Sequence, residues 1–163
     1  MAGLPGTGKT TLAYALSRAL NWHVIDKDKL KEILLQHKWN EDIVGIATYD
    51  LAFDIARNVL EKQRASIILD SAALHTFILE KALKLVELIP GARLKIILCI
   101  ADRITRDDRL RKRPYQLTNI RVNPETIPDY LRLFEHLPSH TLQLYTLNPL
   151  HEYLEEAKSY LLS

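Results

Sequence analysis

Hydrophobic residues follow two kinds of spacing along the chain, and their alternation predicts an α/β fold. Segments in which apolar residues recur every three or four positions are typical of helices with one buried face. Short runs that are continuously apolar, or that alternate with polar residues, are typical of strands. The first kind predicts helices at residues 12–20, 30–34, 43–60, 79–89, 102–113, 129–137 and 150–161, and the second predicts strands at 22–25, 65–69, 94–100 and 141–147.

The order of these segments favours a central parallel sheet with helices on both faces. Strands that alternate with long helices form βαβ units, in which each helix crosses over one face of the sheet. We therefore expect a three-layer α/β domain. The chain has 163 residues, fewer than the roughly 250 at which hydrophobic cores begin to divide, and no linker interrupts it. A single domain over residues 1–163 follows.

Charge and cysteine content narrow the range of partners. Lysine and arginine number 22 against 20 aspartates and glutamates, a formal net charge of +2. A surface built throughout for nucleic acid or anionic lipid carries a larger excess, so any anion site must be local. The single cysteine, Cys99, excludes an internal disulfide.

No apolar stretch approaches the roughly 18 residues of a membrane span, and the N-terminus lacks a signal-peptide pattern. We expect a cytoplasmic protein without a membrane partner.

A glycine-rich loop at the start of the chain carries the clearest chemical signal. Residues 3–10 read Gly-Leu-Pro-Gly-Thr-Gly-Lys-Thr and fit the phosphate-binding pattern GxxxxGK[ST] before a predicted helix. Glycines let the backbone N–H groups turn inward around phosphate oxygens, where a Cβ would obstruct the approach. The helix N-terminus adds partial positive charge. The expected nucleotide-binding residues are Gly3, Gly6, Thr7, Gly8, Lys9, Thr10 and Thr11.

The same pattern implies ATP and Mg²⁺ as the bound species. In such loops the lysine reaches the β- and γ-phosphates and the next hydroxyl binds Mg²⁺. Lys9 and Thr10 take these two positions here. A chance glycine turn before a helix is the alternative, but the full eight-residue pattern followed by a helix argues against it.

Three further segments extend the similarity beyond the loop. They are residues 24–31, the strand end at 67–70 and the basic segment at 109–113. Together with the loop, they resemble the P-loop kinases of small substrates, in particular the AAA-like or zeta-toxin-like ATP-binding group. This group is similar to chloramphenicol phosphotransferase and to the kinase half of polynucleotide kinases. The resemblance runs over nearly the whole chain, and the loop is its most specific part.

The resemblance implies roles for acidic residues at two strand ends. In these kinases the acidic residue just after the second strand is the usual general base, which takes the proton of the substrate hydroxyl. Asp28 matches that position, with Asp26 as the fallback, and a helix N-cap is the structural alternative for Asp28. Asp70 ends a buried strand, where an acidic residue of this fold holds Mg²⁺ through water or contacts the substrate. An ordinary loop acid at a strand exit is the alternative for Asp70.

The resemblance also implies a lid over residues 102–128. Arg106, Arg109 and Arg113 fall on one face of the predicted helix. Lid arginines of these kinases close over ATP and offset the charge of the transferring group. Arg109 and Arg113 therefore join Lys9 and Asp28 as candidate catalytic residues. A solvated, charged helix face is the alternative.

The implied activity is transfer of the γ-phosphoryl group of MgATP to a hydroxyl group of a small molecule or nucleotide. Three other functions fit the same motifs: a kinase of nucleic-acid ends, a zeta-toxin-like kinase of a sugar nucleotide, and an ATP-binding module without catalysis. The basic residues cluster on the lid rather than along a groove, which disfavours nucleic acid. The acceptor and the oligomeric state stay open.

The start of the chain leads to an expectation about the sheet. A phosphate-binding loop normally follows a buried strand of roughly five or six residues, but only Met1 and Ala2 precede Gly3. The resemblance implies the strand order 2-3-1-4-5, so this first strand would lie between those ending at Asp70 and Ile100. We expect it to be absent from the chain. Either the recorded start lies downstream of the true one, or the domain is a truncated relative that borrows a strand or folds poorly.

Overall fold

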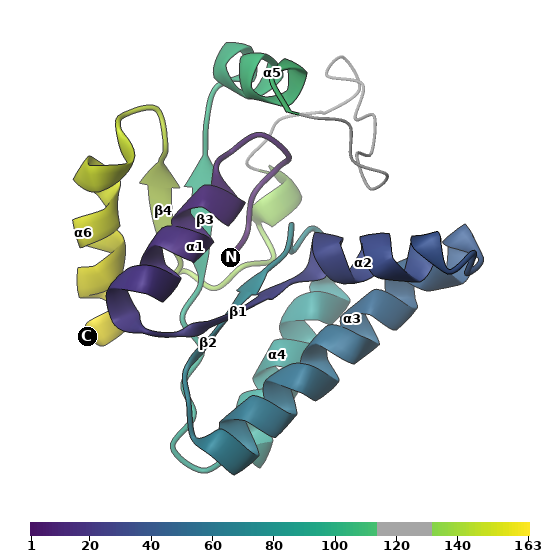
Figure 1. The fold of residues 1–163 in the computed structure, drawn as a ribbon. Coiled ribbons are helices and arrows are strands. Elements are labelled where there is room, and N and C mark those ends of the chain that lie inside the picture. Colours follow the sequence, from purple (N-terminus) through teal and green to yellow (C-terminus); the bar gives the residue numbers. More distant parts are fainter. Residues whose placement is uncertain (114–131) are drawn as a thin grey trace.

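The computed structural model describes residues 1–113 and 132–163, which form alternating helices and short strands (Figure 1). The helices are α1 (Lys9–Leu20), α2 (Lys27–Gln36), α3 (Glu41–Asn58), α4 (Thr76–Leu88), α5 (Arg103–Arg111) and α6 (Leu150–Leu162). The strands are β1 (His23–Asp26), β2 (Ile67–Asp70), β3 (Ile97–Ile100) and β4 (Leu142–Tyr145). A π-helical turn, η1 (Val59–Gln63), continues α3, and a 3₁₀ turn, η3 (Arg132–Phe134), precedes β4.

The strands form two parallel pairs. β1 pairs with β2 in a register that sets Asp26 opposite Asp70. β3 pairs with β4 in a register that sets Ile100 opposite Tyr145. Because the strands in each pair run in the same direction, the carboxyl ends of each pair lie together, which is where α/β sheets bind their ligands.

Met1 and Ala2 lie between the two pairs. The N–H of Ala2 donates to the carbonyl of Ile97 at 2.8 Å, and the N–H of Cys99 donates to the carbonyl of Ala2 at 2.9 Å. On the other side, the α-amino group of Met1 donates to the carbonyl of Leu69 at 2.9 Å. The order is therefore β1, β2, the pair Met1 and Ala2, β3 and β4, with these two residues in the place predicted for the central strand.

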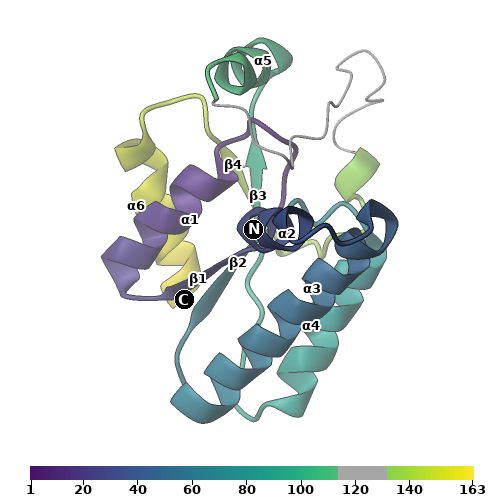
Figure 2. The same cartoon turned by 45° about the vertical axis from the view of Figure 1, so that its right-hand side comes forward.

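Helices cover both faces of the strands. α1 packs against α6 on one side, and α3 packs against α4 on the other (Figures 1 and 2). Each side has its own buried cluster of apolar side chains, which is what holds the layers together. The first cluster includes Leu12, Leu16, Cys99, Leu144 and Ala157, and the second includes Ile25, Ala52 and Ala56. The α/β fold with parallel strands is thereby confirmed.

Several element boundaries differ from the predicted ones. α2 begins at Lys27, three positions before the periodic apolar residues, because the Asp26 side chain caps it. β3 is shorter than the predicted strand at 94–100, since pairing with β4 begins only at Ile97. The predicted helix at 129–137 contains the 3₁₀ turn η3, and its first three positions lie outside the described residues. The predicted lid is described only as far as Arg113.

Cys99 lies in the middle of β3 and is fully buried. Burial raises the pKa of the Cys99 thiol to about 11. The thiol is therefore protonated at neutral pH, and since thiolates are the reactive form, Cys99 acts as a small apolar core residue.

Candidate active site

The glycine loop folds closely against two other segments. Gly3 has a φ of +134°, and a Cβ there would lie 2.5 Å from the carbonyl oxygen of Cys99. Gly6 has a φ of +83°, and its Cβ would lie 2.8 Å from the carbonyl oxygen of Arg106. Both the dihedral angles and the close approaches therefore require glycine. The loop ends at Gly8, the N-cap of α1, so the N-terminal N–H groups of this helix belong to the site.

Thr7 and Lys9 hold the loop from within. The fully buried Thr7 hydroxyl donates to the carbonyl of Leu4 at 2.8 Å, and Lys9 Nζ donates to the same carbonyl at 2.9 Å. Burial lowers the pKa of Lys9, and the negative charge of Asp70 opposes that effect. The Thr7 side chain is thus occupied by the loop itself, while Thr11 is exposed on the first turn of α1.

Asp70 is a buried carboxylate beside this loop, with only 5% of its surface exposed. Burial raises the pKa of Asp70, whereas a hydrogen bond with Thr10 and the charge of Lys9 lower it. Its Oδ1 atom has no hydrogen-bond partner within the described parts of the chain. Carboxylate and hydroxyl oxygens are ligands that Mg²⁺ accepts. Thr10 and Asp70 therefore fit the predicted role of cation ligands.

Asp26 and Asp28 have different surroundings. Asp26 is the N-cap of α2: its Oδ1 accepts from the N–H groups of Asp28 and Lys29, each at 3.1 Å. The hydroxyl of Tyr14 donates to the other oxygen at 3.4 Å. Asp28 lies in the first turn of the helix, its side chain is 69% exposed, and Lys27 Nζ is 3.7 Å away. The capping role that was the alternative for Asp28 thus belongs to Asp26, and the Asp28 carboxylate is open to solvent.

Arg109 on α5 reaches back to the glycine loop. Its guanidinium donates to the carbonyl of Gly6 at 3.3 Å and to both the hydroxyl and the carbonyl of Thr146, just beyond β4. Its polar contacts in this structure are therefore with the protein backbone and one hydroxyl. Arg109 joins three segments: the loop, α5 and the end of β4.

The other two arginines of the predicted face lie at different depths. Arg106 is 7% exposed and packs against Gly6. Arg113 follows α5 and lies close enough to Lys9 for its positive charge to lower the pKa of that lysine, as burial also does. Asp28 acts on Lys9 in the opposite direction. The structure thus gathers Lys9, Asp28 and Arg113 in one region of the molecule.

The sequence also matches a known family over most of its length. The pattern of a family described as an AAA domain fits residues 1–137. The chain belongs to the AAA domain family. The resemblance found in the motifs is thereby confirmed. Among curated proteins, none matches the chain.

Solved structures share the fold of this AAA domain. A protein from Chloroflexus aurantiacus described as an inferred kinase has a TM-score of 0.71 and 21% identity, with 99% of this chain and 93% of that chain covered. APS kinase from Mycobacterium tuberculosis, in complex with AMPPNP and APS, has a TM-score of 0.66 and 16% identity, covering 99% and 95%. A gluconokinase from Sinorhizobium meliloti has a TM-score of 0.61 and 19% identity, covering 99% and 89%. At such identities the likeness concerns the fold.

The helices of the AAA domain give no membrane span. None of those in the described residues combines the length and the apolarity that crossing a bilayer requires.

Thr146 is a site residue that the sequence motifs did not reveal. It is fully buried, and its hydroxyl lies 2.7 Å from the carbonyl of Thr7 and 3.2 Å from that of Ile100. It also accepts from Arg109 at 3.3 Å. The available signal was its place: a hydroxyl residue near the end of the last predicted strand, 141–147, at the edge where parallel strands end. Thr146 ties the glycine loop to β3 and to α5.

Replacing Thr146 by valine is expected to lower the free energy of unfolding by about 1–3 kcal/mol, because its buried partners lose hydrogen bonds. Thr141→Val is the matched control. The Thr141 hydroxyl is also buried, but it has no hydrogen-bond partner within the described residues. Its removal should change stability by no more than about 0.5 kcal/mol or should stabilise the protein. Urea denaturation of both variants measures the difference, and equal losses would contradict the role given to Thr146.

A cluster of aromatic side chains stands beside the two acidic strand ends. Tyr49 on α3 is 8% exposed, and Lys27 Nζ lies 5.1 Å from the centre of its ring. The Phe77 ring meets Tyr49 edge to face at 5.5 Å between centroids. Burial raises the pKa of Tyr49 to about 12, against a hydrogen bond with Ser71 that lowers it. Tyr49 is thus uncharged at neutral pH, and its ring forms a wall on the same side of the AAA domain as Asp28 and Asp70.

Proposed function

We propose that this AAA domain is a kinase that transfers the γ-phosphoryl group of MgATP to a hydroxyl group of a small molecule. The observation that carries the proposal is the buried Asp70 carboxylate beside Lys9 and Thr10, with one oxygen lacking a hydrogen-bond partner within the described residues. Such an atom destabilises a folded protein unless a ligand satisfies it. Its position at the phosphate-binding loop supports a role in holding the cation of MgATP.

Each part of the site then has a distinct task. The N–H groups of the loop and of the first turn of α1 bind the phosphates, and Lys9 balances their charge. Thr10 and Asp70 hold Mg²⁺, which supplies further neutralisation of the phosphates when it is bound. Asp28 accepts the proton of the acceptor hydroxyl. Asp26 is engaged in capping α2 and thereby fixes the position of the Asp28 backbone.

The two candidate lid arginines, Arg109 and Arg113, have different proposed roles. Arg113 is near Lys9 and brings positive charge toward the transferring group. Arg109 is bonded to the carbonyl of Gly6 and to Thr146, so it orients the loop that holds the phosphates. Both roles are part of the proposal, and they differ in what each arginine touches.

The acceptor is proposed to lie between Asp28 and the wall formed by Tyr49. Lys27, whose side chain is only 12% exposed, brings a positive charge to this side, which favours acceptors that carry an anionic group as well as a hydroxyl. Two of the structures with this fold are described as a gluconokinase and an APS kinase. Small polar acceptors of that kind fit the proposal better than a nucleic-acid end, because the basic residues of the sequence cluster at 106–113 rather than along a groove.

The test is ATP consumption measured against a panel of acceptors. The panel holds sugar acids including gluconate, sugars, APS, nucleosides, sugar nucleotides, hydroxylated antibiotics and a labelled oligonucleotide. The proposal expects ADP formation that depends on one small acceptor, whose mass increases by one phosphoryl group. ATP binding without turnover on any acceptor would instead mark a nucleotide-binding module. Phosphorylation of the oligonucleotide alone would identify a kinase of nucleic-acid ends.

A further inference from the structure

Loop 71–75 joins the end of β2 to the start of α4 and contacts both sides of the proposed site. Its first residue, Ser71, is 6% exposed and forms a hydrogen bond with the side chain of Tyr49, the wall of the proposed acceptor site. The carbonyl of Ala72 accepts from the N–H of Gly3 in the glycine loop at 3.1 Å. Loop 71–75 thus connects the acceptor side with the nucleotide side.

Ala73, in the middle of this loop, has a left-handed backbone with a φ of +52°. This conformation is unfavourable for a residue with a Cβ, whereas glycine adopts it readily. The φ of Ala73 also sets the direction of the peptide group between Ala72 and Ala73. A change to the ordinary negative φ would rotate that peptide and turn the Ala72 carbonyl away from Gly3. Contacts from elsewhere in the fold must therefore stabilise the left-handed Ala73.

His136 supplies such a contact. Its Nε2 atom lies 3.1 Å from the carbonyl oxygen of Ala73, and because a carbonyl only accepts, Nε2 carries the proton and donates it. The imidazole ring stacks on Phe134, with 6.5 Å between the centroids and 26° between the planes. Phe134 is 4% exposed and packs in a buried cluster with Leu4 of the glycine loop. The ring that binds Ala73 is thus itself fixed by the core.

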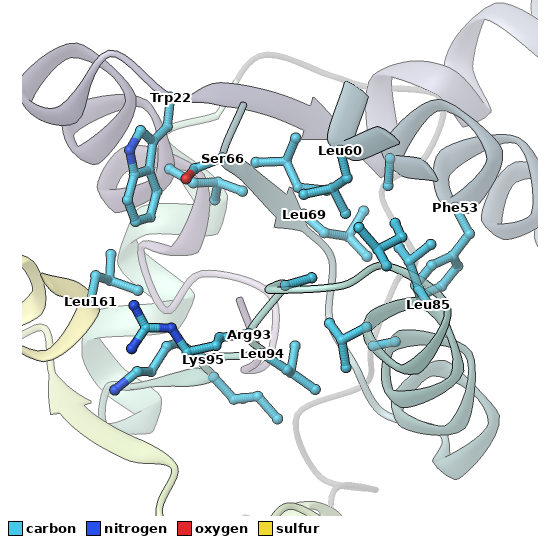
Figure 3. A pocket seen from close by; sticks show the side chains of 18 of the residues that line it. Trp22, Phe53, Leu60, Ser66, Leu69, Leu85, Arg93, Leu94, Lys95 and Leu161 are labelled. Carbon is cyan, nitrogen blue, oxygen red and sulfur yellow. The ribbon is translucent and has the colours of Figure 1, made fainter. Parts of the chain in front are cut away.

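Packing does less to fix the loop on its other side. Ser71 and Ala73 border a mainly apolar cavity of about 900 Å³ in the middle of the fold (Figure 3). Leu137, next to His136, borders the same cavity. Groups that face a cavity lack contacts on that side, so loop 71–75 depends more on its hydrogen bonds than a closely packed segment would. The bond from His136 acts on the strained residue itself.

We propose that His136 is a positioning residue for the acceptor site. Its bond to Ala73 keeps loop 71–75 in the conformation in which Ser71 supports Tyr49, the wall against which the acceptor binds. This role rests on the proposed function, since it concerns the same acceptor site. His136 follows the predicted lid in the sequence, so its bond joins that part of the chain to the acceptor side of the molecule.

The test begins with His136→Phe, assayed with ATP and the acceptor found in the panel. Phenylalanine keeps a ring beside Phe134 but removes the donor, so loop 71–75 loses its bond at Ala73. The KM for the acceptor is expected to rise about 3–10-fold, the effect of one neutral hydrogen bond. Both kcat and the affinity for ATP should stay within about twofold, because the bonds within the glycine loop and from Arg109 are unchanged.

Two further variants separate positioning from a general loss of stability. His136→Gln retains an N–H donor near the place of Nε2 and should keep the acceptor KM within about twofold of that of the unmodified protein. Ala73→Gly, added to His136→Phe, should lower the raised KM again, because glycine adopts the left-handed conformation without assistance. The matched control is His140→Phe: His140 is exposed, so the same substitution should leave the acceptor KM unchanged.

Hydrogen exchange at Gly3 tests the loop without any enzymatic activity. Release of the Ala72 carbonyl in His136→Phe should speed exchange of the Gly3 amide by at least about threefold, while exchange in β4 stays unchanged. If the unmodified protein phosphorylates no acceptor, the proposed function fails, and this exchange alone decides whether His136 fixes the loop.

Three results would overturn the role of His136. The first is an acceptor KM and a Gly3 exchange rate in His136→Phe that equal those of His140→Phe. The second is faster exchange at Gly3 with an unchanged acceptor KM, which would show that the loop does not serve the acceptor. The third is a raised acceptor KM that Ala73→Gly does not lower, which would show that His136 acts by a route other than this loop.

Discussion

Replacing Lys9 by alanine is expected to lower the rate of phosphoryl transfer by about 10²–10³-fold. Lys9 is the one described lysine at the glycine loop, where its Nζ lies 2.9 Å from the carbonyl of Leu4 and its charge acts on Asp70. Its ammonium group offsets negative charge that builds up on the phosphates in the transition state. The measurement is single-turnover transfer at saturating ATP with the acceptor found in the panel.

The control for Lys9 is Lys62→Ala. Lys62 is exposed on η1, far along the chain from the loop, and its removal changes the net charge by the same amount. The rate should then stay within about twofold of the unmodified protein. Because alanine at position 9 also leaves Asp70 without its neighbouring cation, melting curves must show that both variants are folded. Full activity in a folded Lys9→Ala protein would rule out the proposed site.

Asp28→Asn is expected to lower turnover by about 10²–10⁴-fold, the usual worth of a general base. The substitution keeps the shape of the side chain and removes its ability to take a proton. Asp28 lies outside the glycine loop and is largely exposed, so the affinity for ATP should change little. Turnover and ATP affinity are therefore measured separately, and only turnover should fall.

Asp26→Asn is the matched control for Asp28. Asparagine caps helices about as well as aspartate, so the bonds to the N–H groups of Asp28 and Lys29 persist and stability changes little. Activity should stay close to that of the unmodified protein. Loss of activity in Asp26→Asn with normal activity in Asp28→Asn would assign the base to Asp26.

The fold and the loop were predictable because both depend on local sequence. Apolar spacing marks helices and strands, and the eight-residue pattern from Gly3 to Thr10 specifies a phosphate-binding loop by itself. The family match to residues 1–137 agrees with both. The pairing of Asp26 with Asp70 also follows from parallel strands whose carboxyl ends meet.

The side-chain partners were not predictable, because they depend on contacts between distant segments. Helical spacing placed Arg109 on one face with Arg106 and Arg113, but it could not reveal that the Arg109 guanidinium is held by Gly6 and Thr146. A cap is likewise decided by one position: the sequence suggested that role for Asp28, whereas the structure gives it to Asp26. Thr146 has no motif, and only the closure of β4 beside β3 brings it to the loop.

The bond between Thr146 and the glycine loop has a consequence for the order in which the protein is made. Thr7 of the loop is made 139 positions before Thr146, whose hydroxyl ties the loop to β3. α6, which packs on α1 directly behind the loop, is made later still. The glycine loop therefore acquires its contacts with Thr146 and the support of α6 only after these later segments have been made.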